Sequence, residues 1–176
     1  MEWRFTLQGL IEHAVGTGEH YDLLDRTTWS SGPWDKEPDA VAFQYHGLWC
    51  SIARHPLMGT LNGYVRVPAG HPWHGIGYEQ LRHVVDVHGG PTFADCGDAG
   101  DETAWYVGFD CGHSFDFMPN PMFQLLNAEY RTFGYVHEQC ITLAQQAEKA
   151  AQDGIFVLPC ETAARDTVIE LNGAFN

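Results

Sequence analysis

Short apolar runs separated by turn-forming residues dominate the middle of the chain. The run VAFQYHGLWCSIAR (41–54) has two β-prone arms with Gly47 between them, which predicts a hairpin. Three further strands are predicted by GYVRVP (63–68), HVVDVHG (83–89) and AWYVGFD (104–110). The last run is apolar at both its even and its odd positions, so we expect it at the centre of a sheet with both faces covered.

A helical period follows these runs. Apolar residues recur at steps of three and four in one stripe, formed by Tyr130, Phe133, Val136, Cys140, Leu143 and Ala147. The stripe predicts a helix over roughly 127–153, with Gly154 as its C-terminal stop. Because the strands are short and separated mostly by turns, the predicted fold class is α+β. We expect a mainly antiparallel sheet with one long amphipathic helix packed on a face.

The length of 176 residues favours a single domain, 1–176. Within it, residues 1–30 are interpreted as an N-terminal extension, with a short helix expected within 1–27. Residues 32–153 form the core that bears the motifs, and 154–176 form a tail that adds a strand or a short helix.

The composition adds a strong acidic bias, with 23 Asp and Glu residues against 9 Lys and Arg and a formal net charge of −14. Proteins bind nucleic-acid backbones largely through Lys and Arg, so we expect no direct nucleic-acid binding. Two interpretations of the charge stay open. It keeps an acidic protein soluble by repulsion, or it forms a surface that binds a basic partner protein.

The first residues, MEWRFTLQGLIEHAVG, lack a basic region followed by a long apolar run, so they do not indicate a signal peptide. No apolar stretch approaches the ~20 residues that cross a bilayer, and we expect no membrane partner. The five cysteines are odd in number and contain no C-x-x-C pair, which indicates free thiols in a reducing compartment. We therefore predict a cytoplasmic protein.

Groups that bind metals or transfer protons follow the last predicted strand, in VGFDCGHSFDF (107–117). For Asp110, His113 and Asp116 to converge, the chain must turn after the strand, and Gly112 gives the backbone that freedom. Imidazole and carboxylate groups are ligands for zinc and similar divalent metals, and a carboxylate beside a histidine favours general-base work. The alternative is a turn in which Asp110 caps backbone amides.

A second candidate segment is DVHGGPTF (86–93), in which His88 adds another imidazole. The backbone amides of Gly89 and Gly90 are candidates for holding an anionic group, and Thr92 for donating a hydrogen bond to a ligand. The alternative is a strand that ends in a tight turn without binding a ligand.

A third candidate is PAGHPWHG (68–75), where Pro72 excludes helical pairing of His71 with His74. The segment predicts a rigid loop over the sheet edge, with His71 as a ligand-binding candidate. Arg54, at the end of the predicted hairpin, is a candidate for neutralising the charge of a ligand. For the segment 68–75, the alternative is a surface loop without a site.

The order of several segments carries a resemblance. These are GPWDKEPD (32–39), GYVRVPAGHPWHG (63–75), VDVHGGPTF (85–93), WYVGFDCGHSFD (105–116) and YRTFGYVHEQC (130–140). Over about residues 32–145 the chain resembles a widespread family of small phage and prophage proteins without an established activity. The family motifs fall on His71, His88, Asp110, His113 and Asp116. The resemblance implies a shared pocket and a host-directed or anti-defence role.

The leading hypothesis is a metal-assisted or acid–base hydrolase of a small nucleotide-like substrate. It makes His88, Asp110 and His113 catalytic, and it makes the same three residues and Asp116 ligands of a divalent metal such as zinc. Two alternatives stay open. One is a non-catalytic binder of a signalling nucleotide, and the other is an acidic, anti-CRISPR-like inhibitor of a basic host protein.

Overall fold

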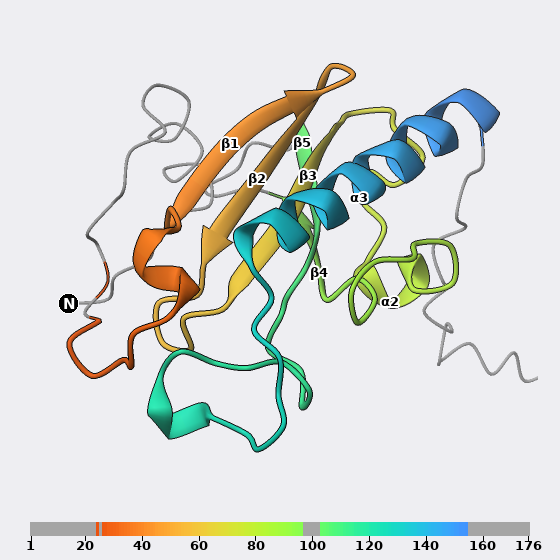
Figure 1. Ribbon diagram of the computed structural model, residues 1–176. Coiled ribbons are helices and arrows are strands. Elements are labelled where there is room, and N and C mark those ends of the chain that lie inside the picture. The colour runs from red at the N-terminus through yellow and green to blue at the C-terminus, as the bar shows by residue number, and fades with distance from the viewer. Residues whose placement is uncertain (1–23, 25, 97–102, 155–176) are drawn as a thin grey trace, which may run out of the picture.

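The computed structural model describes residues 24, 26–96 and 103–154 (Figure 1). Five strands form one sheet: β1 (Ala40–Tyr45), β2 (Leu48–Arg54), β3 (Leu61–Pro68), β4 (Phe93–Cys96) and β5 (Ala104–Phe109). They lie in the order β1-β2-β3-β5-β4, and every neighbouring pair is antiparallel. The long helix α3 (Phe133–Asp153) crosses one face of the sheet (Figure 1). The predicted α+β fold is confirmed.

Three short helical segments lie in the connections. They are η1 (Pro33–Lys36), α2 (Tyr78–Leu81) and η3 (Pro121–Phe123). In the part of the chain that the structure describes, no helix is long and apolar enough to cross a membrane. The element expected within residues 1–27 and the one expected in the tail lie outside the described residues, apart from 24, 26 and 27 at the first end and Gly154 at the second.

The predicted hairpin is β1 and β2, joined by a two-residue turn of His46 and Gly47. Both turn residues have positive φ, 46° and 84°. This backbone matches the right-handed twist of the flanking strands, and glycine adopts it without a steric penalty. Gly47 therefore sets the register in which Tyr45 lies opposite Leu48.

The run predicted at the sheet centre is β5, which lies between β3 and β4 and is buried along most of its length. Its neighbour β4 was not predicted, because FADC has neither a clear alternation nor a long apolar run. The sheet edge that β4 forms is exposed at three of its four residues.

The strand predicted at 83–89 is wrong, because this segment pairs with no strand. Side chains of α3 take the place of a neighbouring strand instead. Gln146 accepts a hydrogen bond from the Asp86 amide and donates one to the Asp86 carbonyl, both at 2.8 Å. Gln139 accepts from the His88 amide at 2.8 Å.

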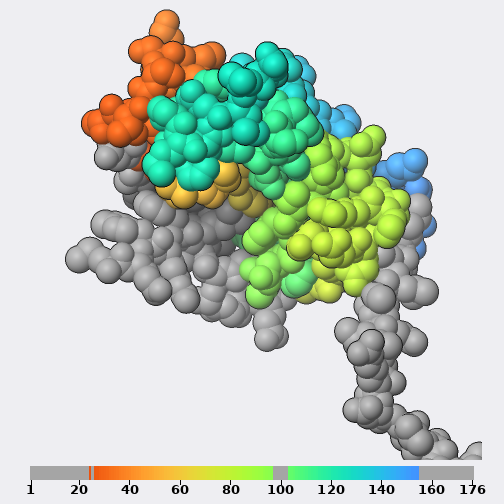
Figure 2. Space-filling model, turned by 90° about the horizontal axis from the view of Figure 1, so that it is seen from below, coloured from red at the N-terminus to blue at the C-terminus, as the bar shows by residue number. Residues whose placement is uncertain are grey.

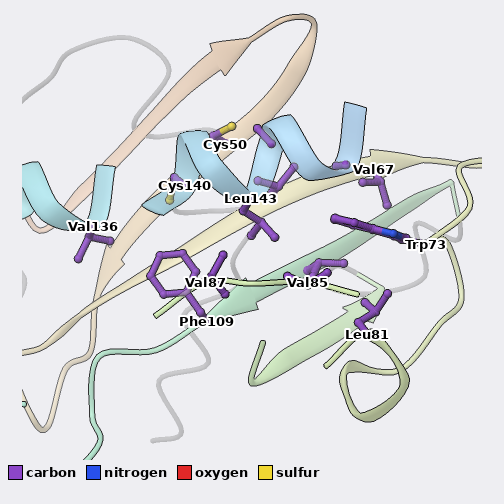
Figure 3. Packing of buried hydrophobic residues seen from close by; sticks show 14 of the residues in the cluster. Cys50, Val67, Trp73, Leu81, Val85, Val87, Phe109, Val136, Cys140 and Leu143 are labelled. Carbon is purple, nitrogen blue, oxygen red and sulfur yellow. The ribbon is translucent and has the colours of Figure 1, made fainter. Parts of the chain in front are cut away.

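The alternation that predicted a strand at 83–89 has a different cause. Val85 and Val87 are buried in the core beside Leu81 and Phe109, while Asp86 between them is exposed (Figure 3). The segment is thus buried on one side without belonging to the sheet. Its contacts with α3 hold His88 at a fixed place beside the helix.

Helix α3 begins at Phe133, six residues after the predicted start. Thr132 caps it by accepting a hydrogen bond from the Tyr135 amide at 3.3 Å. The predicted stop is confirmed, since Gly154 has a left-handed backbone with φ of 61°. Tyr130 therefore lies before the helix and outside its apolar stripe.

The core lies between α3 and the sheet (Figure 3). Val136, Cys140 and Leu143 of the helix are fully buried against strand residues such as Val65 and Phe109. A side chain at Gly63 would place its Cβ 2.5 Å from the Cys140 sulfur. Glycine at this position of β3 therefore permits the close approach of the helix to the sheet.

Candidate functional site

Asp116 is the centre of a buried polar cluster, and its side chain is 0% exposed. Its Oδ2 accepts hydrogen bonds from His88 Nε2 at 2.8 Å and from His113 Nδ1 at 3.1 Å. The His113 amide also donates to Oδ2, at 3.0 Å. The other oxygen, Oδ1, accepts from Arg131 Nε at 2.9 Å. We call His88, His113 and Asp116 the Asp116 cluster.

The turn predicted after β5 brings two members of the cluster together. The Asp116 amide donates to the His113 carbonyl at 2.9 Å, which closes the turn. Residues on either side of Asp116 then pair with Glu129 in both directions, at 2.9 and 3.0 Å. The cluster is therefore fixed by backbone contacts on both sides. The chain after β5 and the segment before β4 reach the same face of the molecule (Figure 2).

The hydrogen bonds assign the protons of both imidazoles. An ionised carboxylate only accepts, so His88 Nε2 and His113 Nδ1 carry hydrogen. In the neutral ring, His88 Nδ1 then has the lone pair and accepts a hydrogen bond from the Tyr135 hydroxyl at 2.9 Å. Among the described residues His113 Nε2 has no hydrogen-bond partner, and the His113 side chain is 24% exposed. His113 is thus the member of the cluster that solvent and ligands can reach.

Asp116 is ionised in this environment. Burial alone would raise the pKa of its carboxyl group, but hydrogen bonds from His88, Arg131 and the His113 amide outweigh burial and lower the pKa below its usual range. A buried carboxylate with four donors is a stable acceptor, and it is also a ready metal ligand.

The ligand atoms of the cluster fit a metal ion, since they all lie within 4.8 Å of one another. In a tetrahedral zinc site with metal–ligand distances of ~2.0–2.1 Å, neighbouring ligand atoms are about 3.3 Å apart. The contacts of Asp116 Oδ2 with the two imidazoles, 2.8 and 3.1 Å, are close to that spacing. To bind a metal, the ligand atoms, which are up to 4.8 Å apart, would have to move to this spacing, and each ring proton would have to move to the other nitrogen. In His88 the transferred proton would lie on Nδ1, beside the Tyr135 hydroxyl. That hydroxyl can accept a hydrogen bond as well as donate one.

Gly89 permits the imidazole of His113 to lie against the backbone. A Cβ at this position would be 2.1 Å from His113 Cε1 and 2.3 Å from Nε2. Gly89 therefore acts through close packing, which differs from the predicted role in holding an anion. The amide of Gly90 is also engaged, since it donates to the Val87 carbonyl at 2.9 Å.

Gly89→Ala is expected to displace His113 and to weaken zinc binding by at least about tenfold. Gly90→Ala is the matched control, because Gly90 also has positive φ (82° against 66°) but no atom lies within 4 Å of its added Cβ. Both variants should lose about 1–2 kcal/mol of stability from the left-handed backbone. Competition with a zinc-binding dye measures the difference. Equal zinc affinities of the two variants would contradict the packing role of Gly89.

Asp110 lies beside the cluster without joining it. Its Oδ1 accepts from the Gly112 amide at 2.8 Å, as the alternative interpretation of the turn expected. The same oxygen is 3.9 Å from His113 Nδ1, and its side chain is 33% exposed. The spacing excludes Asp110 from the set of atoms that converge as metal ligands. Asp110 remains close enough to act on a group bound at His113.

Thr92 is not brought to the cluster by any hydrogen bond in the described structure. Its amide donates to the Gly108 carbonyl at 2.9 Å, which continues the pairing of β4 with β5. The hydroxyl group was the predicted ligand donor, and that prediction stays without structural support.

His71 lies away from the cluster. His71 Nε2 contacts the carbonyl of Ala147 at 3.0 Å, whereas His88 contacts Tyr135. These helix positions are twelve residues apart, which is about 18 Å along the axis. The Trp73 amide donates to His71 Nδ1 at 3.0 Å, so the ring is a neutral structural link between its loop and α3. The prediction that His71 shares one site with His88 is wrong.

His71→Gln is expected to reduce the acid sensitivity of the fold. Burial lowers the pKa of His71 below its ordinary 6.5, although the Ala147 carbonyl opposes this shift. Because the folded state disfavours the charged ring, stability is present above the unfolded pKa and is lost as pH falls toward the folded value. The melting temperature of the wild type should fall more between about pH 7 and pH 5 than that of His71→Gln. The exposed His83→Gln is the control, and its melting should follow the wild type.

Arg54 forms a second buried network, separate from the cluster. Its guanidinium donates to Asp39 Oδ1 at 2.7 Å, to the Gly59 carbonyl at 2.9 Å and to the Tyr130 hydroxyl at 2.8 Å. Tyr130 in turn donates to Glu37 at 2.6 Å. The Arg54 side chain is 0% exposed and paired on every side, so the prediction that it neutralises a ligand is wrong.

Sequence reasoning missed Arg131 and Tyr135, which contact the cluster from the start of α3. The apolar stripe that predicted the helix includes neither residue. The arginine lies in the segment YRTFGYVHEQC (130–140) that carries the resemblance, but no role was predicted for it. A signal existed in the spacing, since Arg131 and Tyr135 are four residues apart and stack with 5.2 Å between guanidinium and ring centre.

Comparisons of the chain with protein-family models, with curated proteins and with solved structures gave no match. The resemblance to phage and prophage proteins therefore stays a prediction.

Proposed function

We propose that the protein is a metal-dependent hydrolase of a small nucleotide-like substrate, with the Asp116 cluster as its metal centre. One observation carries the proposal: two imidazole nitrogens and a buried carboxylate oxygen, from two segments of the chain, lie within 4.8 Å of one another. Three protein ligands leave a tetrahedral metal with one open position, which is the arrangement of hydrolytic zinc sites.

The metal would supply a bound water whose pKa is lowered to about 7. His88 Nε2, His113 Nδ1 and Asp116 Oδ2 would hold the metal, and Tyr135 would fix the orientation of the His88 ring. Asp110, 3.9 Å from the His113 nitrogen, would accept a proton from a water at the centre. The catalytic role predicted for Asp110 is therefore kept, while its role as a ligand is not.

Metal binding and hydrolysis are tested on the same preparations. Zinc titration with chelator reversal should show one bound ion per chain in the wild type. The metal-loaded protein should hydrolyse members of a panel of nucleoside phosphates and cyclic nucleotides, and the chelator should abolish this. His88→Ala should lose both properties, whereas the exposed His83→Ala should keep both.

Two results would overturn the proposal. A folded wild type that binds neither zinc nor another divalent transition metal excludes the metal centre. A protein that binds metal and returns every nucleotide chemically unchanged excludes hydrolysis and favours a binding protein instead.

A second candidate function is docking on a basic protein. The loop 117–128 contains no charged residue, although the chain carries 32 of them. Met122 and Leu126 at its tip are 83% and 96% exposed, and such surfaces mark interaction sites. A partner with an apolar groove and basic surroundings would suit this loop and the net charge of −14. Met122→Asp with Leu126→Asp should abolish such binding and leave zinc affinity unchanged, while His88→Ala should do the reverse.

A further inference from the structure

We infer that the substrate of the Asp116 cluster carries an oxyanion, such as a phosphate group, and that Arg131 binds it beside the metal. The inference rests on the proposed metal centre and names the class of molecule that the centre accepts. It also moves the charge-neutralising role predicted for Arg54 to a different arginine.

The Arg131 guanidinium is held in a fixed position. Its Nε donates to Asp116 Oδ1, while the opposite oxygen of that carboxylate faces the two imidazoles. The guanidinium also lies 5.2 Å from the Tyr135 ring centre and 5.9 Å from that of Phe115. A carboxylate and two rings thus hold its plane, so little side-chain entropy is lost when it binds a ligand.

The Arg131 guanidinium also has unused hydrogen-bonding capacity. A guanidinium has five N–H donors, and within the described residues Arg131 uses one for Asp116 and one for Glu129. The Glu129 side chain is 76% exposed, and a pair of this kind contributes little free energy. An incoming oxyanion can therefore displace Glu129 and meet two parallel donors, the geometry that arginine offers to phosphates and carboxylates.

The net charge around the Asp116 cluster links oxyanion binding to the metal. Without a metal, the carboxylates around the cluster exceed the single arginine by two formal charges, counting Asp110, Asp116, Glu129 and Arg131. The chain as a whole carries −14, so an anion is repelled from most of the molecule. A divalent cation cancels the local excess. Oxyanion binding should therefore depend on metal loading as well as on Arg131.

The experiment is a calorimetric titration of the full-length protein with inorganic phosphate. The protein is first saturated with zinc, and free metal is then removed before the titration. Phosphate should bind the zinc-loaded wild type and not the metal-free form. Arg131→Gln should weaken phosphate binding by at least about tenfold, and Arg131→Lys, which keeps the charge but loses the paired donors, should fall between. Arg82→Gln removes the same charge from an exposed arginine paired with Glu79, and it should stay within about twofold of the wild type.

The outcomes separate this inference from the proposed function. If zinc binds but phosphate affinity at zinc saturation is the same in Arg131→Gln and the wild type, only the role of Arg131 is excluded. Phosphate binding to the metal-free protein, or none to the zinc-loaded protein, excludes the inference that an oxyanion binds beside the metal. If the wild type binds no metal at all, the metal centre fails and this inference fails with it.

Discussion

Asp116→Ala is expected to abolish zinc binding and to lower the free energy of unfolding by about 3–5 kcal/mol. The variant removes the acceptor of four hydrogen bonds and leaves the nearly buried His88 ring and the Arg131 guanidinium without their shared partner. Stranding buried donors costs more than the lost contacts themselves contribute. Denaturant unfolding measures the stability, and a zinc-binding dye measures the affinity.

Asp110→Asn is the matched control for this variant. Asp110 is one-third exposed and accepts one backbone hydrogen bond, so its replacement should cost less than about 1 kcal/mol. An Asp116→Ala protein as stable as Asp110→Asn, or with zinc affinity close to that of the wild type, would contradict the central place of Asp116 in the cluster.

The lowered pKa of Asp116 also gives this variant a pH signature. The folded state favours the ionised carboxylate, so the stabilisation is present above the unfolded pKa of about 3.9 and is lost as pH falls toward the lower folded value. The difference in stability between wild type and Asp116→Ala should therefore be constant near neutral pH and shrink in acid.

The sequence predicts the parts of this fold that depend on local rules. The turn at Gly47 follows from the backbone of two-residue hairpins, and the end of α3 follows from the left-handed backbone of Gly154. The failure at 83–89 is not local. The alternation of Val85 and Val87 reports burial on one side, and burial alone does not reveal that Gln139 and Gln146 replace a strand as hydrogen-bond partners.

The candidate site was predictable in part for the same reason. His113 and Asp116 are three residues apart on one turn, so their meeting depends on local geometry. The addition of His88 depends on where α3 holds its segment, which no local pattern determines. His71 lies in a similar motif but is about 18 Å away along the helix, because a motif records a residue type and not its position in the fold.

Arg54→Met is expected to destabilise the fold by about 3–5 kcal/mol without changing zinc affinity. The side chain is fully buried and joins Asp39, Gly59 and Tyr130, which belong to three separate segments. Its loss leaves the buried Asp39 carboxylate with Arg26 as its remaining ionic partner among the described residues. The exposed Arg82→Met should cost less than about 1 kcal/mol. Adding Asp39→Leu to Arg54→Met should recover part of the loss, since it removes the buried carboxylate that Arg54→Met leaves with Arg26 alone. Additive losses in this pair, measured by denaturant unfolding, would show that the two residues act independently.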